Sequence, residues 1–213
     1  MTADARQPVT VEDLRATTAA VQAALRTVED QDWSQNAGGL TWSCEDTVRH
    51  MVSALGSYFC NLAVGSPSRI TTVGPRPELT KAELISVIGT AGEVLVHVAI
   101  AAPPGRRGFH ALGHPDAEGY LAMGCTELLA HTWDVMRGFG QDFDAPDGVC
   151  DDVLRRIFPW APADTPRWQT LLWATGRAEL PGHGRLGDDW DWHCDPLEEW
   201  DGTRAGQSAE RHW

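Results

Sequence analysis

The sequence predicts an all-α protein organised around a four-helix bundle. Four long segments carry apolar residues at helical spacing, and loops rich in glycine and proline separate them. No segment shows the alternation of a β-strand convincingly, and the best candidate, residues 70–73, is short. The chain has 213 residues, of which 42% are hydrophobic, so it can form one domain with a sizeable core. These observations favour long helices packed against one another.

Local signals indicate where the helices begin and end. Thr10, Ser43 and Thr80 each precede an apolar helical segment and are expected to cap its first turn. Asp46 and Glu83 follow two of these caps by three residues, as in a capping box. We therefore expect long helices over residues 11–29, 43–64, 80–102 and 116–139, and shorter helices over residues 147–158 and 164–177.

The chain divides into a bundle, residues 1–178, and a short C-terminal extension, residues 179–213. Glycine, aspartate and tryptophan dominate the extension, so we expect it to be mostly irregular and packed on the bundle. Tryptophans are concentrated towards this end of the chain: Trp173, Trp190, Trp192, Trp200 and Trp213. Two interpretations stay open, namely rings that fasten the extension to the core and an aromatic platform for a ligand.

The acidic composition narrows the classes of partner. Lys and Arg number 17 against 30 Asp and Glu, which gives a formal net charge of −13 at pH 7. Such a surface repels phosphate backbones and anionic lipid, so binding of nucleic acid or membranes is not expected. No uninterrupted apolar run approaches the length of a membrane span, and no signal-peptide pattern is visible. We expect a soluble cytoplasmic protein that is a monomer or a homodimer.

Two further features of composition bear on the cofactor. The five cysteines form no CxxC pair and are expected to be reduced thiols. Lys81 is the only lysine, and the other 16 basic residues are arginines. This bias is typical of GC-rich genomes such as those of actinobacteria.

The sharpest local pattern is the pair Glu127 and His131. Two residues four positions apart on a helix project from one face, one turn apart, and can reach the same metal ion. Asp134 follows His131 by three residues and could orient a metal-bound imidazole from behind. Gly124 and Gly138 share this face, which indicates close approach by either a ligand or a neighbouring helix.

A metal site needs a third ligand, and His50 is the best candidate. It lies in the middle of the second expected helix but off its apolar stripe, beside small uncharged residues. This position fits the lining of a polar cavity, and it equally fits a mildly polar solvent face.

Three segments together resemble the DinB-like superfamily, in its mycothiol-dependent maleylpyruvate isomerase-like branch. The first joins Asp32-Trp33 to residues 40–51, which end in the helix start with His50. The second is residues 127–135, close to the family's Glu-x-x-x-His-x-Trp-Asp pattern, and the third is residues 171–177, which end in Gly-Arg. These segments span most of residues 10–177.

The resemblance implies a DinB-like bundle in which His50, Glu127 and His131 hold a divalent ion near one end. Zinc is the usual metal, with nickel, iron and manganese as alternatives. Two histidines and a carboxylate leave a coordination position open, for water at rest and for a thiol sulfur in the working complex. Family members use the ion to lower the pKa of a low-molecular-weight thiol, in actinobacteria mycothiol, which then attacks a small electrophile.

The chain also departs from this branch. The isomerase carries an additional sterol-carrier-like domain, for which the residues after Arg177 are too few, so a transferase acting on another electrophile is expected. Two alternatives stay open: a DinB-fold metalloenzyme of specialised metabolism without thiol dependence, and a non-catalytic bundle that binds metal or a small ligand. No cysteine is expected to be the nucleophile, because Cys125 lies about 160° around the helix from Glu127 and Cys44 adjoins two acidic residues.

The remaining histidines are weaker candidates. His110 and His114, in the loop before the fourth long helix, either contact substrate or are solvated. His97 belongs to the core or to the bundle surface. His193 and Cys194 either lie near the site or are buried for structural reasons, and the second interpretation is preferred.

Overall fold

The structure, a computed structural model, describes residues 6–187 and 190–204. These residues contain no β-strand, which confirms the prediction of an all-α bundle and leaves residues 70–73 as irregular chain. Trp213 lies outside the described residues. The helices are α1 (Val11–Arg26), α2 (Cys44–Val64), α3 (Lys81–Ala101), α4 (Ala117–Gly138), α5 (Asp147–Ile157), α6 (Arg167–Ala174) and the short 3₁₀-helix η1 (Leu197–Glu199).

The expected caps are confirmed at the starts of three helices. The hydroxyls of Thr10, Ser43 and Thr80 each accept a hydrogen bond from the backbone N–H three residues further on. Helix α6 is shorter than expected at both ends. Pro166 precedes its first residue, and Gly176, with φ of +73°, turns the chain away after it.

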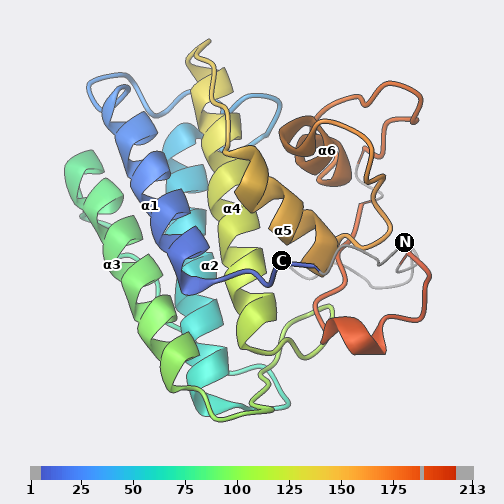
Figure 1. Ribbon diagram of the computed structural model, residues 1–213. Coiled ribbons are helices and arrows are strands. Elements are labelled where there is room, and N and C mark those ends of the chain that lie inside the picture. Colours follow the sequence, from blue (N-terminus) through green and yellow to red (C-terminus); the bar gives the residue numbers. More distant parts are fainter. Residues whose placement is uncertain (1–5, 188–189, 205–213) are drawn as a thin grey trace.

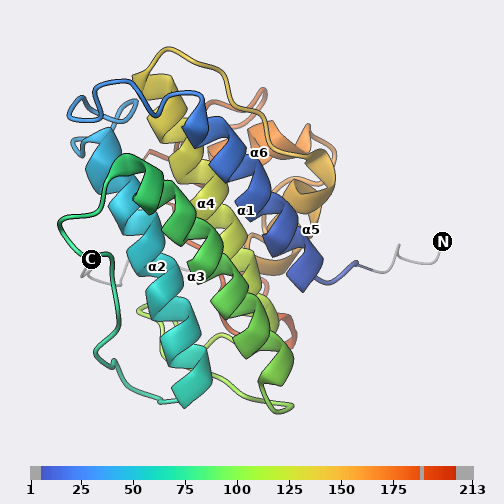
Figure 2. The same cartoon turned by 90° about the vertical axis from the view of Figure 1, so that its left-hand side faces the viewer.

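The four long helices form a bundle in which α1 and α2 each pack against both α3 and α4 (Figures 1 and 2). Helix α1 runs antiparallel to α3, since Gln22 donates to the carbonyl of Ile85 and Arg15 pairs with Glu93. Helices α2 and α3 start at the same end of the bundle. The connection between them, residues 65–80, therefore runs back along the length of α2, as Figure 2 shows.

Hydrogen bonds of Arg49 establish this return path. Arg49 lies in the second turn of α2, and its guanidinium donates to the carbonyls of Arg76, Pro77 and Leu79, just before α3 begins. At the other end, Arg106 donates to the carbonyl of Val64. Helix α4 consequently starts where α2 ends and runs antiparallel to it.

Helix α4 is the central element of the fold. Every residue from Gly119 to Ala130 is buried, because α1 and α2 flank this helix and α5 covers part of its remaining surface (Figure 1). A Cβ atom at Gly124 would lie 3.3–3.5 Å from Leu95, Leu55 and Leu14, so this glycine serves helix packing. A charged side chain within this stretch has no access to bulk water and requires a partner.

Helix α3 is the one described helix that is long and apolar enough to cross a membrane by length and composition. Of its apolar window, 39% is buried, and it packs along α1 and α2 as one wall of the bundle. A core helix of a soluble protein passes the same test, so this finding is compatible with solubility.

A buried arginine ties the segment after Trp192 to the bundle. Arg156 of α5 is fully buried, and its Nη2 atom lies 2.8 Å from Oδ1 of Asp116, the N-cap of α4. Its Nη1 atom donates to the carbonyl of Asp195 at 3.0 Å, and its Nε atom lies 3.5 Å from Oε2 of Glu118. These contacts join α4, α5 and the segment after Trp192. The division of the chain at residue 178 stays a prediction.

Candidate metal centre

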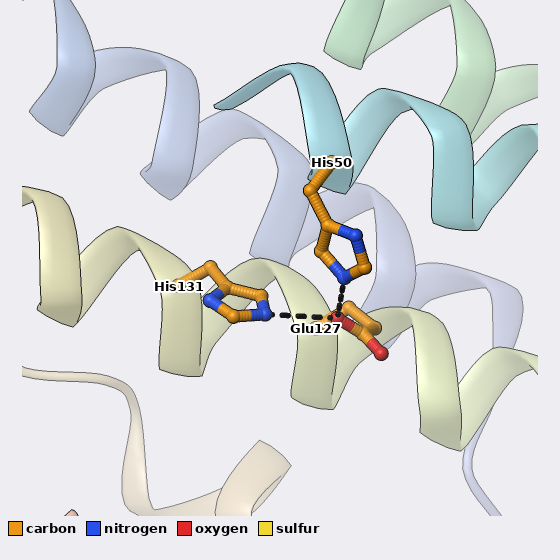
Figure 3. Close-up of side chains that lie close together, drawn as sticks. All are labelled: His50, Glu127 and His131. Atoms are coloured by element: carbon orange, nitrogen blue, oxygen red, sulfur yellow. Dashed lines mark ion pairs between the residues drawn. The ribbon is translucent and has the colours of Figure 1, made fainter. Parts of the chain in front are cut away.

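The side chains of His50, Glu127 and His131 meet at one point between α2 and α4 (Figure 3). The Nε2 atoms of His50 and His131 each lie 3.3 Å from Oε2 of Glu127. One ligand atom from each residue lies within 4.8 Å of the other two. The structure thus brings together the three residues selected from the sequence.

The fold explains this convergence. Glu127 and His131 are one turn apart on α4, so their side chains project from the same face. Helix α2 is antiparallel to α4 and packs directly against it, which sets His50 at the level of that turn. Of the two positions that the sequence allowed for His50, a polar cavity and a solvent face, the structure has the cavity, and 25% of the imidazole remains exposed.

The donor set fits a divalent ion. Two ligands at about 2.0–2.1 Å from a tetrahedral zinc ion are about 3.3 Å apart. Both nitrogen-to-oxygen distances at this site have that value. Imidazole nitrogen and carboxylate oxygen are ligands that zinc accepts, and three protein ligands are typical of a site with an open position. The group can therefore hold a metal ion.

Glu127 is anchored on the side away from the histidines. Its Oε1 atom accepts a hydrogen bond from the hydroxyl of Tyr58 at 3.0 Å, so only Oε2 faces His50 and His131. Burial alone would raise the pKa of Glu127, but its contacts with the two histidines outweigh burial and hold the pKa well below its usual value. Glu127 is therefore an ionised carboxylate, and the neutral hydroxyl of Tyr58 fixes its orientation.

Asp134 orients His131 through the ring nitrogen that does not face Glu127. The Nδ1 atom of the imidazole lies 2.9 Å from Oδ2 of Asp134, which leaves Nε2 for the site. Arg177 in turn donates to Asp134 through Nη2 at 2.7 Å and through Nε at 3.0 Å. Burial would lower the pKa of His131, but its contacts with Asp134 and Glu127 outweigh burial and raise it. The position proposed for Asp134 on sequence spacing is the one that the structure has.

A cavity of about 720 Å³ gives access to the three ligand atoms. Trp42 forms part of its wall, with its indole centred 4.9 Å from the ring of His50 and 6.3 Å from that of His131. The cavity is also lined by Trp133, Trp190 and Trp192. Trp190 and Trp192 therefore take part in the site, and Trp192 is also buried, so the two interpretations of the C-terminal tryptophans are not exclusive.

The chain's own thiols lie away from this cavity, since none of its lining residues is a cysteine. Burial raises the pKa of Cys44 to about 11 and that of Cys125 to about 12, which opposes thiolate formation near neutral pH. Cys125 faces α1 on the far side of α4, where its thiol contacts Thr17. Cys194 is buried beside His193, and neither residue lines the cavity.

The other histidines within the described residues also lie apart from the ligand atoms. His97 is exposed on α3 and pairs with Glu93. His114 contacts the carbonyl of Pro67. His110 is half-buried between the rings of Tyr58 and Trp192, and burial lowers its pKa to about 4. It is not a lining residue of the cavity.

Several residues of the site were not identified from the sequence. Tyr58 lies eight positions after His50 on α2, and no spacing rule links it to Glu127 on another helix. Arg177 appeared in the Gly-Arg pattern without a role, which its contact with Asp134 now provides. Gly138 was assigned to the site face, but a Cβ there would lie 2.6 Å from the carbonyl oxygen of Asn36, so close packing of the loop explains it.

Comparison with family models, with curated proteins and with solved structures finds no match for this chain.

Proposed function

We propose that this chain is a divalent-metal-dependent thiol transferase or isomerase of the DinB-like superfamily. In this proposal His50, Glu127 and His131 hold the ion, most simply zinc, and a low-molecular-weight thiol such as mycothiol reacts with a small electrophile. The observation that carries the proposal is the convergence of two imidazole nitrogens on one carboxylate oxygen beside an open cavity. A purely structural ion would need no such access.

When bound, the ion supplies a positive charge that lowers the pKa of a thiol entering the open position. The protein residues contribute orientation and charge. Asp134 fixes which nitrogen of His131 faces the site, and Arg177 keeps Asp134 ionised and in place. Tyr58 holds Glu127 so that a single oxygen points towards the histidines.

The reaction needs a thiol from outside the chain. The thiol loses its proton, its sulfur forms a bond to an electrophilic carbon, and either a leaving group departs with the bonding electrons or the adjacent carbon takes up a proton. The five cysteines are free in the structure and none lines the cavity, which supports an external thiol. We place this reaction in the cytoplasm, where such thiols stay reduced.

The test is conjugation of mycothiol to monochlorobimane, in which a carbon–sulfur bond forms and chloride leaves. We expect zinc-loaded protein to raise the rate above background and metal-stripped protein to return it to background. Glutathione and cysteine, run in parallel, identify the preferred thiol. A His97→Ala variant is the matched control, because this histidine is exposed on α3 and far from the ligand set.

Two outcomes would overturn the proposal. If the purified protein fails to bind zinc, nickel, iron or manganese, the metal centre itself is wrong. If it binds metal but accelerates conjugation with none of the thiols, across a panel of electrophiles, the metal serves a thiol-independent enzyme or a binding protein.

A further inference from the structure

The hydroxyl of Tyr58 holds Glu127 on the side away from the histidines, at 3.0 Å from Oε1. Tyr58 is 4% exposed, and burial together with the charge of Glu127 raises its pKa well above the usual value. The phenol therefore keeps its proton and donates it to the hydrogen bond. Because the direction of the hydroxyl depends on rotation about the Cα–Cβ bond of Tyr58, the groups packed on this ring also determine how Glu127 is held.

Among the described residues, two rings from outside α2 pack on Tyr58. The ring of Tyr120, on α4, is centred 5.7 Å from that of Tyr58, and the ring of His110, in the loop between α3 and α4, is centred 6.1 Å from it. Tyr120 is itself tied to this loop, since its hydroxyl donates to the carbonyl of Phe109 at 2.9 Å. The loop before α4 therefore meets Tyr58 both directly and through Tyr120.

The imidazole of His110 is oriented by the turn in which it lies. The backbone N–H of His110 donates to the carbonyl of Gly113 at 2.9 Å, and the N–H of Gly113 donates back at 3.1 Å. The Nδ1 atom of His110 accepts a hydrogen bond from the N–H of Leu112 at 3.2 Å. One end of the ring is thus fixed to its own loop while its body packs on Tyr58.

The ring of His110 is also kept neutral. Burial lowers its pKa to about 4, although the charge of Glu127 acts in the opposite direction. Near neutral pH the Nδ1 atom therefore remains an acceptor for the N–H of Leu112, because a protonated imidazole has no acceptor nitrogen. Histidine at this position combines a flat ring for packing on Tyr58 with an acceptor that fixes the turn.

We infer that His110 is a positioning residue for Glu127, because it holds the hydroxyl of Tyr58 against Oε1 and so leaves Oε2 directed at the two histidines. The inference rests on the proposed function in that it assigns His110 an effect on metal affinity. The contacts among His110, Tyr58 and Glu127 belong to the protein itself. Loss of a residue behind a metal ligand costs about 10–100-fold in affinity, and His110 acts one residue further away, so we expect about tenfold.

Two substitutions separate positioning of Tyr58 from stabilisation of the turn. His110→Phe keeps a flat ring beside Tyr58 but removes the acceptor for the N–H of Leu112. His110→Asn removes the ring but keeps an acceptor, because an asparagine oxygen bonds the backbone two residues on. In calorimetric zinc titrations we expect about tenfold weaker binding in His110→Asn and binding within about twofold of the wild type in His110→Phe. A role limited to the turn gives the reverse order and overturns the inference.

A double-mutant cycle with Tyr58→Phe shows whether His110 acts through Tyr58. Tyr58→Phe should weaken zinc binding by about tenfold or more, since it removes the hydroxyl that holds Glu127. Adding His110→Asn should weaken binding no further, because the contact that His110 supports is already lost. Additive losses would overturn the inference. His114→Asn is the matched control, since His114 lies in the same loop but is exposed and contacts the carbonyl of Pro67.

The same cycle in urea denaturation of metal-free protein separates this inference from the proposed function. Tyr58→Phe should destabilise the protein, since it removes a hydrogen bond to a buried carboxylate. In the His110→Asn background this destabilisation should fall to about half or less. That result supports the role of His110 even if the protein binds no metal or transfers no thiol. An equal effect of Tyr58→Phe in both backgrounds overturns the inference. If circular dichroism shows that His110→Asn does not fold, His110→Gln, which also lacks a ring, replaces it in both cycles.

Discussion

Helix α4 carries two buried charged groups, one at its start and one in its middle turns, and the two groups are built differently. At its start, Asp116 and Glu118 surround the guanidinium of Arg156. Three turns further on, Glu127 and His131 face His50 of the neighbouring helix. Each group contains one charged side chain that is buried, Arg156 in the first and Glu127 in the second, and both groups connect elements that are distant in the sequence.

The two groups differ in what surrounds their charged atoms. The Nη1 and Nη2 atoms of Arg156 donate to a backbone carbonyl and to the carboxylate of Asp116. Its Nε atom lies 3.5 Å from Glu118 without a hydrogen bond in the described structure, so carboxylates of the protein itself neutralise the charge. At the other group, two imidazole nitrogens point at one oxygen, and a cavity opens beside them. Burial of charge is common to structural and functional groups. Convergence of ligand atoms on one point beside open space distinguishes the second.

Removal of His131 should have the largest effect on metal binding. His131→Ala is expected to weaken zinc binding by more than about a hundredfold, because even loss of a residue behind a ligand costs about 10–100-fold. The bundle should stay folded, since its stability comes from the apolar faces of its helices. Calorimetric zinc titration and circular dichroism measure the two effects, with His97→Ala as control. Unfolding of the variant would instead indicate a structural ion.

Removal of Arg156 should lower the stability of the fold and leave zinc binding unchanged. Arg156→Ala is expected to lower the free energy of unfolding by about 2–4 kcal/mol, since it strands two carboxylates that remain partly exposed. Its zinc affinity should equal that of the wild type. Arg155→Ala, at an exposed pair with Asp151, should cost about 0.5 kcal/mol or less in the same denaturation experiment. Weakened zinc binding in folded Arg156→Ala would contradict the separation of the two groups.

The pH dependence of the metal-free protein follows from the same contacts. The pKa of His131 is raised above 6.5, so its proton stabilises the fold fully below 6.5, and this stabilisation is lost as pH rises through the folded-state value. The pKa of Glu127 is lowered below 4.5, so its charge stabilises the fold above 4.5 and loses this effect as pH falls through its folded-state value. Both contributions are present between pH 4.5 and 6.5.

Zinc needs the histidines without their protons, so its stabilising effect should grow as pH rises through the pKa of His131. Denaturation of zinc-free and zinc-saturated protein across about pH 5–8 measures this growth. A zinc effect that does not change over this range would mean that His131 is not a ligand.

The smallest effect is expected from Cys125→Ser. The thiol is buried against α1, so the substitution should cost about 1 kcal/mol of stability, because a hydroxyl replaces an apolar group. Turnover with an external thiol should persist. Loss of turnover at unchanged zinc content would show that the enzyme uses its own sulfur.

Local signals made most of the fold predictable. Thr10, Ser43 and Thr80 determine three helix starts through contacts within one turn, which a sequence displays directly. The end of α6 was placed too late although Gly176, with φ of +73°, is itself a local stop signal just after the last turn. The tertiary contact there, with the carbonyl of Gly187, leaves no room for a side chain and has no local signal of its own.

In the candidate site, too, some residues were predictable from local spacing and others depend on tertiary contacts. The pair Glu127 and His131 was visible because both residues lie on one helix, and His50 followed from its position off the apolar stripe. Tyr58 acquires its role only when α2 packs against α4, and Arg177 acquires its role only when the segment after α6 meets α4. Spacing along the chain carries no information on such contacts.

The central claim is that residues on two different helices share one metal ion, and zinc stoichiometry of His50→Ala tests it most directly. After dialysis against zinc, elemental analysis should find about one ion per chain in the wild type. In the variant it should find essentially none, although circular dichroism shows an intact bundle, since Glu127 and His131 alone supply two ligands. One zinc ion per chain bound to His50→Ala with wild-type affinity would contradict the claim.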